Sequence, residues 1–240
     1  MDFNLFKEEM KKYSKKIEIL LDDKQIESFY NYMNILIEEN KKINLTAIVE
    51  PKEIILKHFI DSLTIEKNIE ENKKVIDIGT GAGFPGIPVK IYRKDMDLVL
   101  LDSLNKRINF LNQVIKDINL DSIVAVHSRV EDFSKDLNNR ESFDVVISRA
   151  VASLNILLEY MLPLVKVGGK CICMKGSNIE EELKESKKAL EILGGEIEKT
   201  DKTELPYSDI TRNIIIIKKV KHTPNKFPRN PGMATKKPII

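Results

Sequence analysis

The sequence has no tryptophan and only two cysteines and three histidines among its 240 residues. Cys171 and Cys173 stand two positions apart in an apolar stretch, so both thiols would lie on one face of a strand. With no further cysteine and so few histidines, neither a disulfide framework nor a metal site is expected. We therefore interpret both thiols as packed core groups and predict that the protein binds no metal.

The sequence also lacks any apolar run of the ~20 residues that a membrane-spanning helix needs. Its first residues, MDFNLFKEEMKK, are charged and lack the apolar centre of a signal peptide. These two absences predict a cytoplasmic protein with no membrane partner.

Acidic residues are missing from one long segment. The whole chain has a formal net charge of +2, yet residues 212–240 include eight lysines and arginines and no aspartate or glutamate. Positive charge gathered at one end favours a polyanionic partner such as a nucleic acid.

The length of the chain suits one domain with an appendage. We predict a helical N-terminal extension over 1–70, a cofactor-binding domain over 71–221 and a basic C-terminal arm over 222–240. In the extension, Asp22 and Asp23 can cap a helix whose apolar residues recur at helical spacing.

A further helix of the extension is expected to begin at Pro51, after the polar and β-branched stretch KKINLTAI at 41–48. It would carry His58 and Asp61 on one face, because they are three positions apart. On these cues alone, His58 is interpreted as a structural histidine in preference to a functional one.

From Lys73 onward, strand and helix patterns alternate, as in an open, mostly parallel sheet with helices on both faces. The strands are predicted at 74–78, 97–102, 122–127, 143–148, 169–174, 196–204 and 212–220, and the helices at 84–94, 105–118, 153–165 and 178–192. The last two strands resemble a hairpin, and no stretch remains for a separate substrate domain. The expected fold is an α/β, Rossmann-like, seven-stranded sheet whose strand ends bind ligands at one edge.

The most informative segment is KVIDIGTGAGFPGIP, residues 74–88. A β-branched strand runs into Gly79, Gly81, Gly83 and Gly86, and an apolar helical pattern follows. Glycine lets backbone N–H groups and the helix N-terminus approach a ligand where a Cβ would collide. The segment therefore favours a nucleotide-like ligand.

The glycine spacing fits two cofactors. Gly81, Gly83 and Gly86 satisfy the dinucleotide fingerprint G-x-G-x-x-G, and Asp102 lies 19 residues beyond Gly83, where a ribose-binding acid belongs. Asp77 extends the run to D-x-G-x-G-x-G, which resembles motif I of the class I S-adenosylmethionine-dependent methyltransferases. A carboxylate there would attract the ammonium group of S-adenosylmethionine and repel a pyrophosphate, so we favour S-adenosylmethionine.

Other strand ends complete the predicted pocket. Asp102 ends the second strand, where a carboxylate can accept hydrogen bonds from both ribose hydroxyls. Val130 and Glu131 follow the third strand, where an adenine would lie, and Glu131 is expected to contribute backbone groups more than its charge. Arg149, beside Ala150, ends the fourth strand near the transferred methyl, and its planar fork suits a cofactor carboxylate or an RNA phosphate.

The tail, KHTPNKFPRNPGMATKKPII, shows neither helical nor strand periodicity and contains four prolines. This pattern predicts an extended arm. Its cations, together with Phe227 beside Arg229, favour an arm that follows phosphates and stacks on bases. We predict phosphate contacts for Lys226, Arg229, Lys236 and Lys237.

Motifs along nearly the whole chain resemble those of one family, the glucose-inhibited division protein B family, also called ribosomal RNA small subunit methyltransferase G. They are NLTAI at 44–48, KHFIDSL at 57–63, DIGTGAGFPGIP at 77–88, LLDSLNKRINFL at 100–111, SRAVASL at 148–154, KG at 175–176 and KFPRNPG at 226–232. By position, the resemblance carries the family's cofactor contacts onto Gly79, Phe84, Val130, Glu131 and Arg149.

The resemblance implies methyl transfer from S-adenosylmethionine to N7 of a guanine in the 530 loop of 16S rRNA, as naked rRNA or in the 30S subunit. A monomer is expected. Guanine N7 carries an in-plane lone pair, so no catalytic general base is needed and Arg149 would act by positioning. The base must leave its stack, which suits a loop. The tail departs from the family at Phe227, where tyrosine is usual, and at Met233-Ala234, where Thr-Pro is usual; these departures concern tail contacts and not the reaction.

Two functions of other classes stay open on the sequence. An NAD-dependent oxidoreductase would use the literal glycine fingerprint and Asp102. A non-catalytic rRNA-binding assembly factor would keep the fold and the basic arm but would show no turnover. A small-molecule methyltransferase fits poorly with the basic arm.

Overall fold

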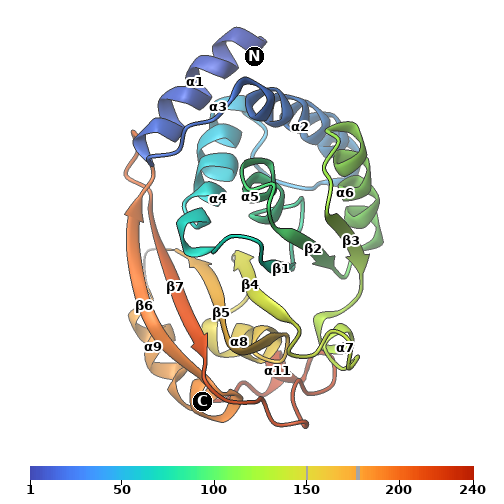
Figure 1. Cartoon of the computed structure of the whole chain (residues 1–240), viewed down its shortest axis with the longest axis vertical. Helices are drawn as coiled ribbons and strands as arrows, with labels where there is room; N and C mark the ends of the chain where they lie inside the picture. Colours follow the sequence, from blue (N-terminus) through green and yellow to red (C-terminus); the bar gives the residue numbers. More distant parts are fainter. Residues whose placement is uncertain (150, 177–178) are drawn as a thin grey trace.

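The β-branched runs form a seven-stranded sheet in the order β3-β2-β1-β4-β5-β7-β6 in a computed structural model that describes residues 1–149, 151–176 and 179–240 (Figure 1). The strands are β1 Lys74–Ile78, β2 Asp97–Asp102, β3 Ile123–His127, β4 Phe143–Arg149, β5 Val165–Lys175, β6 Gly195–Glu204 and β7 Thr211–Lys219. The first five strands pair in parallel, whereas β7 is antiparallel to both β5 and β6. The predicted sheet and its terminal hairpin are confirmed.

Helices cover both faces of this sheet because the strands alternate their side chains. On β1, Val75 packs into one core cluster and Ile76 into the other. The first cluster lies under α1 Phe3–Lys16, α2 Asp23–Ile43, α3 Pro51–Ile54, the π-helical segment η1 Ile55–Ile60, α4 Asp61–Leu63, the short turn η2 Glu66–Asn68, α5 Gly86–Tyr92 and α6 Asn105–Asp117. The second lies under α7 Val130–Phe133, α8 Leu154–Met161, α9 Glu180–Glu185 and α10 Lys187–Leu193.

The N-terminal extension forms as its sequence predicts. Asp22 caps α2 by accepting a hydrogen bond from the Gln25 N–H at 2.7 Å, and the Gln25 side-chain oxygen accepts one from the Asp22 N–H. A continuous helix begins at Pro51 and includes η1 before it ends in α4. These helices share the first core cluster with the sheet. The packing therefore holds the side chains of the extension close to the strand ends. The boundaries near residues 70 and 221 stay predictions.

The C-terminal tail differs from the expected extended arm. Phe227 is 6% exposed and belongs to the second core cluster. Arg140 holds the tail segment that leads to Phe227. It donates to the carbonyls of Phe227 at 2.7 Å and Thr223 at 2.8 Å. A short helix, α11 Met233–Lys236, follows and lies near α8 (Figure 1). The base-stacking role expected of Phe227 is therefore wrong, because its ring is already buried.

Two further expectations have clear outcomes. The single helix expected at 178–192 is two helices, α9 and α10, which meet at Ser186; residue 178 lies outside the described residues. Both cysteines are buried, and burial raises the pKa of the Cys173 thiol to about 12, as expected of a packed core thiol. In the described part of the chain, no helix combines the length and apolar character of a membrane span.

Candidate active site at the carboxyl ends of the strands

A cavity of about 550 Å³ lies where the parallel strands end, between the sheet edge and the N-terminal extension. Its lining includes seven of the nine residues predicted to bind the cofactor: Gly79, Gly81, Phe84, Asp102, Val130, Glu131 and Arg149. The other two, Asp77 and Gly83, do not line it. Ala150, expected near the transferred methyl, lies outside the described residues.

The turn after β1 needs glycine for space as well as for conformation. Gly79 has φ +64°, and a Cβ there would lie 2.7 Å from the Val151 side chain. Gly83 has φ +97°, and a Cβ there would lie 2.8 Å from the Tyr32 hydroxyl. Any side chain at either position would be strained and would collide with its neighbours.

The turn does not offer free backbone donors as expected. Five of its N–H groups already have acceptors within the protein at 2.9 Å, those of Gly79, Gly81, Gly83, Phe84 and Gly86. The expectation of bare N–H groups facing a ligand is therefore wrong for these positions. A pyrophosphate needs such a cradle, so the geometry disfavours a dinucleotide here.

Asp77 lies behind this turn and is fully buried. One of its oxygens accepts hydrogen bonds from the Thr80 hydroxyl at 2.7 Å and the Gly86 N–H at 2.9 Å. Burial raises the pKa of this carboxyl to about 7. These two bonds show that Asp77 stabilises the turn. The contact between Asp77 and the cofactor ammonium stays a prediction.

Asp102 ends β2 with its carboxylate at the cavity wall, where it is only 3% exposed. It accepts from the N–H groups of Gly81 at 2.9 Å and Leu104 at 3.0 Å, and it pairs with Arg107 at 3.1 Å. Arg107 is the one side chain among these partners, and a third of it is exposed. Ligand hydroxyls can take its place at small cost, which suits the predicted ribose role.

The Glu131 carboxylate lies in the cavity wall and is already bonded to the protein. It is 5% exposed, and its Oε1 accepts from the Gly232 N–H of the tail at 3.1 Å. The expectation that the backbone of this turn, more than the Glu131 carboxylate, faces a cofactor stays a prediction. The bond to Gly232 also joins the tail to the cavity wall.

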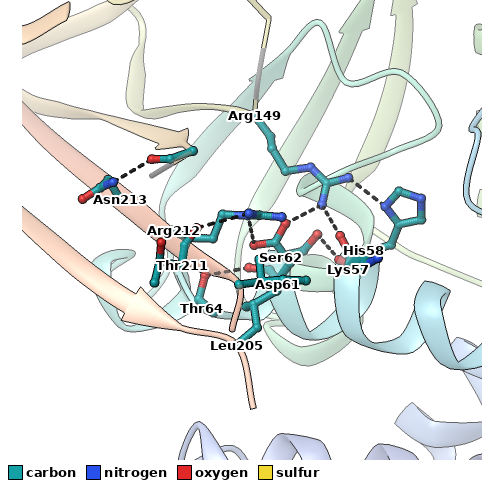
Figure 2. Close-up of polar contacts among 12 residues, drawn as sticks. Lys57, His58, Asp61, Ser62, Thr64, Arg149, Leu205, Thr211, Arg212 and Asn213 are labelled. Carbon is teal, nitrogen blue, oxygen red and sulfur yellow. Dashed lines mark hydrogen bonds and ion pairs between the residues drawn. The ribbon is translucent and has the colours of Figure 1, made fainter. Parts of the chain in front are cut away.

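At the other end of the cavity, Arg149 belongs to a buried polar cluster (Figure 2). Its guanidinium donates to Asp61 and to the Lys57 carbonyl at 3.1 Å each, and it contacts His58 Nδ1 at 3.2 Å. Asp61 also accepts from Arg212 Nε at 3.0 Å. Burial raises the pKa of the Asp61 carboxyl, although both arginines act to lower it. Two arginines thus share one buried carboxylate.

His58 is held by contacts within the protein, as a structural histidine would be, and it also lines the cavity. Its ring stacks on Phe84 at 4.3 Å and 12°, and its Nε2 lies 2.9 Å from Thr46 Oγ1. Burial, with the nearby charge of Arg149, lowers the pKa of His58 to about 3, so the imidazole is neutral near pH 7. Thr46 and His58 both line the cavity, which the sequence reading missed. Their motifs, NLTAI and KHFIDSL, were the available signal.

The tail cations divide into two groups. Arg229 binds the buried carboxylate of Glu159 through Nε at 2.9 Å and NH2 at 2.6 Å. Its predicted phosphate contact stays a prediction, and such a contact would have to compete with this ion pair. Lys226, Lys236 and Lys237 are exposed.

Comparisons with known proteins place this site in a family. The family model GidB, described as rRNA small subunit methyltransferase G, matches residues 25–214. The chain is 53% identical over 232 residues to "Ribosomal RNA small subunit methyltransferase G" of Desulforamulus reducens, covering 96% of this chain and 97% of that protein. It is 55% identical over 220 residues to the protein of the same name from Acetivibrio thermocellus, covering 91% and 90%.

Solved structures support the fold. A SAM-dependent methyltransferase from Aquifex aeolicus has a TM-score of 0.53 at 16% identity, covering 75% of this chain and 97% of that chain. M. jannaschii TYW2 in complex with AdoMet has a TM-score of 0.50 at 17% identity, covering 65% and 74%.

The predicted resemblance is confirmed over most of the chain. The predicted enzyme class, an S-adenosylmethionine-dependent methyltransferase, is confirmed with it. The chain belongs to the rRNA small subunit methyltransferase G family.

Proposed function

We propose that this protein transfers the methyl group of S-adenosylmethionine to N7 of a guanine in the 530 loop of 16S rRNA. The observation that carries the choice of N7 is the state of the acid–base groups in the cavity wall. Asp102, Glu131 and His58 are each already engaged in hydrogen bonds with the protein. An acceptor that must lose a proton would need one of them to exchange a protein partner for that proton, whereas N7 needs none.

The cofactor fits the cavity with its parts spread along the sheet edge. Asp102 would hold the ribose, and the backbone at Val130 and Glu131 would face the adenine. Arg149 would face the methionine carboxylate or the incoming RNA. When bound, S-adenosylmethionine supplies an electrophilic methyl group on a sulfonium.

The bond changes balance without a proton transfer. The N7 lone pair forms the new C–N bond as the C–S bond breaks, and the positive charge passes from sulfur to the purine ring. The work of the protein is therefore to hold nucleophile, methyl and sulfur in line and to exclude water.

The test is transfer from labelled S-adenosylmethionine to unmodified 16S rRNA and to 30S subunits, with the product located by strand cleavage at 7-methylguanine. One labelled guanine in the 530 loop is expected. The better of the two substrates would show whether ribosomal proteins help to present the base. Tight RNA binding with no transfer would favour the non-catalytic assembly factor instead.

We also propose that the exposed tail lysines, Lys226, Lys236 and Lys237, contact RNA phosphates. Deletion of 222–240 is a poor test, because it would remove the buried Phe227 and the Gly232 contact to Glu131. Replacing the three lysines by glutamine keeps those contacts. The slope of log affinity against log salt should then fall by about 2 to 3, with cofactor affinity unchanged. An unchanged slope would remove these lysines from the interface.

The oligomeric state and the cellular location complete the proposed function. We propose that the protein acts as a monomer in the cytoplasm on small-subunit rRNA. Sedimentation of the free protein and of its RNA complex would test the stoichiometry.

A further inference from the structure

The end of the cavity where Arg149 lies is called the acceptor end, because we place the methyl-accepting base there. It holds a chain of hydrogen bonds in which the donor and the acceptor of each bond follow from the chemistry of the groups. This chain of bonds runs from Asp61 through Arg149 and His58 to Thr46, and Figure 2 shows its first three members. Arg149 can only donate, so we assign the acceptor role to His58 Nδ1, which faces it at 3.2 Å. A neutral imidazole that accepts at Nδ1 carries its proton on Nε2.

This tautomer determines the role of Thr46. His58 Nε2–H donates to Thr46 Oγ1 at 2.9 Å, and the Ile48 N–H donates to the same oxygen at 3.1 Å. A hydroxyl has two acceptor lone pairs and one proton to donate. Both lone pairs are therefore used, and the hydroxyl of Thr46 is left to act as a donor.

The Thr46 proton has no acceptor among residues 1–149, 151–176 and 179–240, and Thr46 lines the cavity. The donor therefore faces the space that a ligand fills. Arg149, at the end of β4, lines the same cavity and reaches Thr46 through His58. Asp102 and Glu131, the carboxylates of the wall, belong to the β2 end and the segment after β3.

We propose that the Thr46 hydroxyl donates a hydrogen bond to O6 of the target guanine and so selects guanine over adenine. The inference rests on the proposed function. O6 and N7 are neighbouring acceptors on one edge of guanine, so a base that offers N7 to the methyl also presents O6. Adenine has a donor, the N6 amino group, at that place, and two donors would face each other. His58 and Asp61 are then positioning residues, which act through Thr46 and Arg149.

The test compares RNA that carries guanine, inosine or 2-aminopurine at the target position, with the rest of the RNA unchanged. Inosine keeps O6 and lacks the 2-amino group, whereas 2-aminopurine lacks O6. The wild-type protein should methylate inosine about as well as guanine and should lose at least about 10-fold in kcat/KM on 2-aminopurine. Equal rates on guanine and 2-aminopurine would overturn the proposal without any variant.

Thr46→Val then completes a cycle. The variant should lose about 10-fold in kcat/KM on guanine and nothing further on 2-aminopurine, because the O6 partner is already missing there. Thr46→Ser should restore transfer to guanine, and the affinity for S-adenosylhomocysteine should be unchanged in both. Thr200→Val, at an exposed threonine of β6, is the matched control and should behave as wild type.

The possible failures are distinguishable. Equal losses for Thr46→Val on guanine and on 2-aminopurine would show that Thr46 acts on the structure of the site and does not contact O6. If wild type methylates no guanine at all, the proposed function fails, and this inference fails with it. Should Thr46→Val not fold, Thr46→Ala serves in the same cycle.

Discussion

The two ends of the cavity differ in origin and in charge. The end beside β2 and β3 carries the carboxylates of Asp102 and Glu131. The end beside β4 carries the cation of Arg149 and the neutral ring of His58. The first end consists of residues that follow directly from strand ends, whereas the second needs the N-terminal extension. The fold thus supplies the cofactor end, and the extension adds the end where we place the acceptor base.

The largest expected effect concerns the cation end. Asp61→Ala removes the one carboxylate that Arg149 and Arg212 share, leaving both guanidinium groups without their buried partner. The free energy of unfolding should fall by about 3–5 kcal/mol, measured by denaturant titration. Asp23→Ala is the matched control, because Asp23 also pairs with two cations but is exposed. That change should lower the free energy of unfolding far less, because solvent screens an exposed ion pair. Similar losses in the two variants would contradict the account.

The next effect concerns the carboxylate end. Asp102→Asn keeps the shape of the side chain but removes the charge that would accept the ribose hydroxyls. The affinity for S-adenosylhomocysteine should fall by about 100-fold in calorimetry, the loss expected for hydrogen bonds to a charged group. Asp97→Asn, at the exposed start of the same strand, should leave the affinity unchanged. If Asp102→Asn binds S-adenosylhomocysteine as tightly as wild type does, then Asp102 does not bind the ribose.

The turn between the two ends should give the smallest effect, through pH. The carboxyl of Asp77 has its pKa raised by burial from 3.8 to about 7 in the folded protein. The folded state therefore binds this proton more tightly, so its contribution to stability is present at low pH and is lost as pH rises through about 7. In Asp77→Asn, the change in unfolding free energy between pH 5 and pH 8 should be smaller than in wild type by about 1–3 kcal/mol.

Asp95 provides a control of opposite sign. Its hydrogen bond to Arg93 holds the pKa of the Asp95 carboxyl well below its ordinary value. It stays ionised between pH 5 and pH 8 whether the chain is folded or not, so Asp95→Asn should leave the pH dependence over this window unchanged. A pH dependence in Asp77→Asn equal to that of wild type would show that Asp77 is ionised throughout.

Local sequence patterns predicted the elements of the cavity more fully than its contacts. The strands β1 and β2 begin and end at the predicted residues, since β-branched runs bounded by turn residues define buried parallel strands. The position of Asp102 in the cavity wall followed from its place at a strand end, and its ribose role stays a prediction. The glycine turn was also located correctly, but its N–H groups bond within the protein, partly to the Thr80 carbonyl of the turn itself and partly to the carboxylates of Asp77 and Asp102.

At the acceptor end only Arg149 was predicted, from its place at the end of β4, because the other parts come from distant segments of the sequence. Thr46, His58 and Arg149 meet only after the extension packs on the sheet. The tail was misread for a related reason, since prolines and cations are typical of an extended arm, whereas Phe227 is buried by distant partners such as Arg140. Contacts of this kind leave no periodic signal.

Methyl transfer to guanine N7 needs no general base, and one substitution in the RNA tests whether N7 is the acceptor. The target guanine is replaced by 7-deazaguanine, which keeps the pairing edge and O6 but has carbon in place of N7. The account predicts rapid transfer to the guanine RNA and none to the 7-deazaguanine RNA, with both RNAs bound equally well. Transfer to the 7-deazaguanine nucleotide would contradict it, because another atom would then be the acceptor.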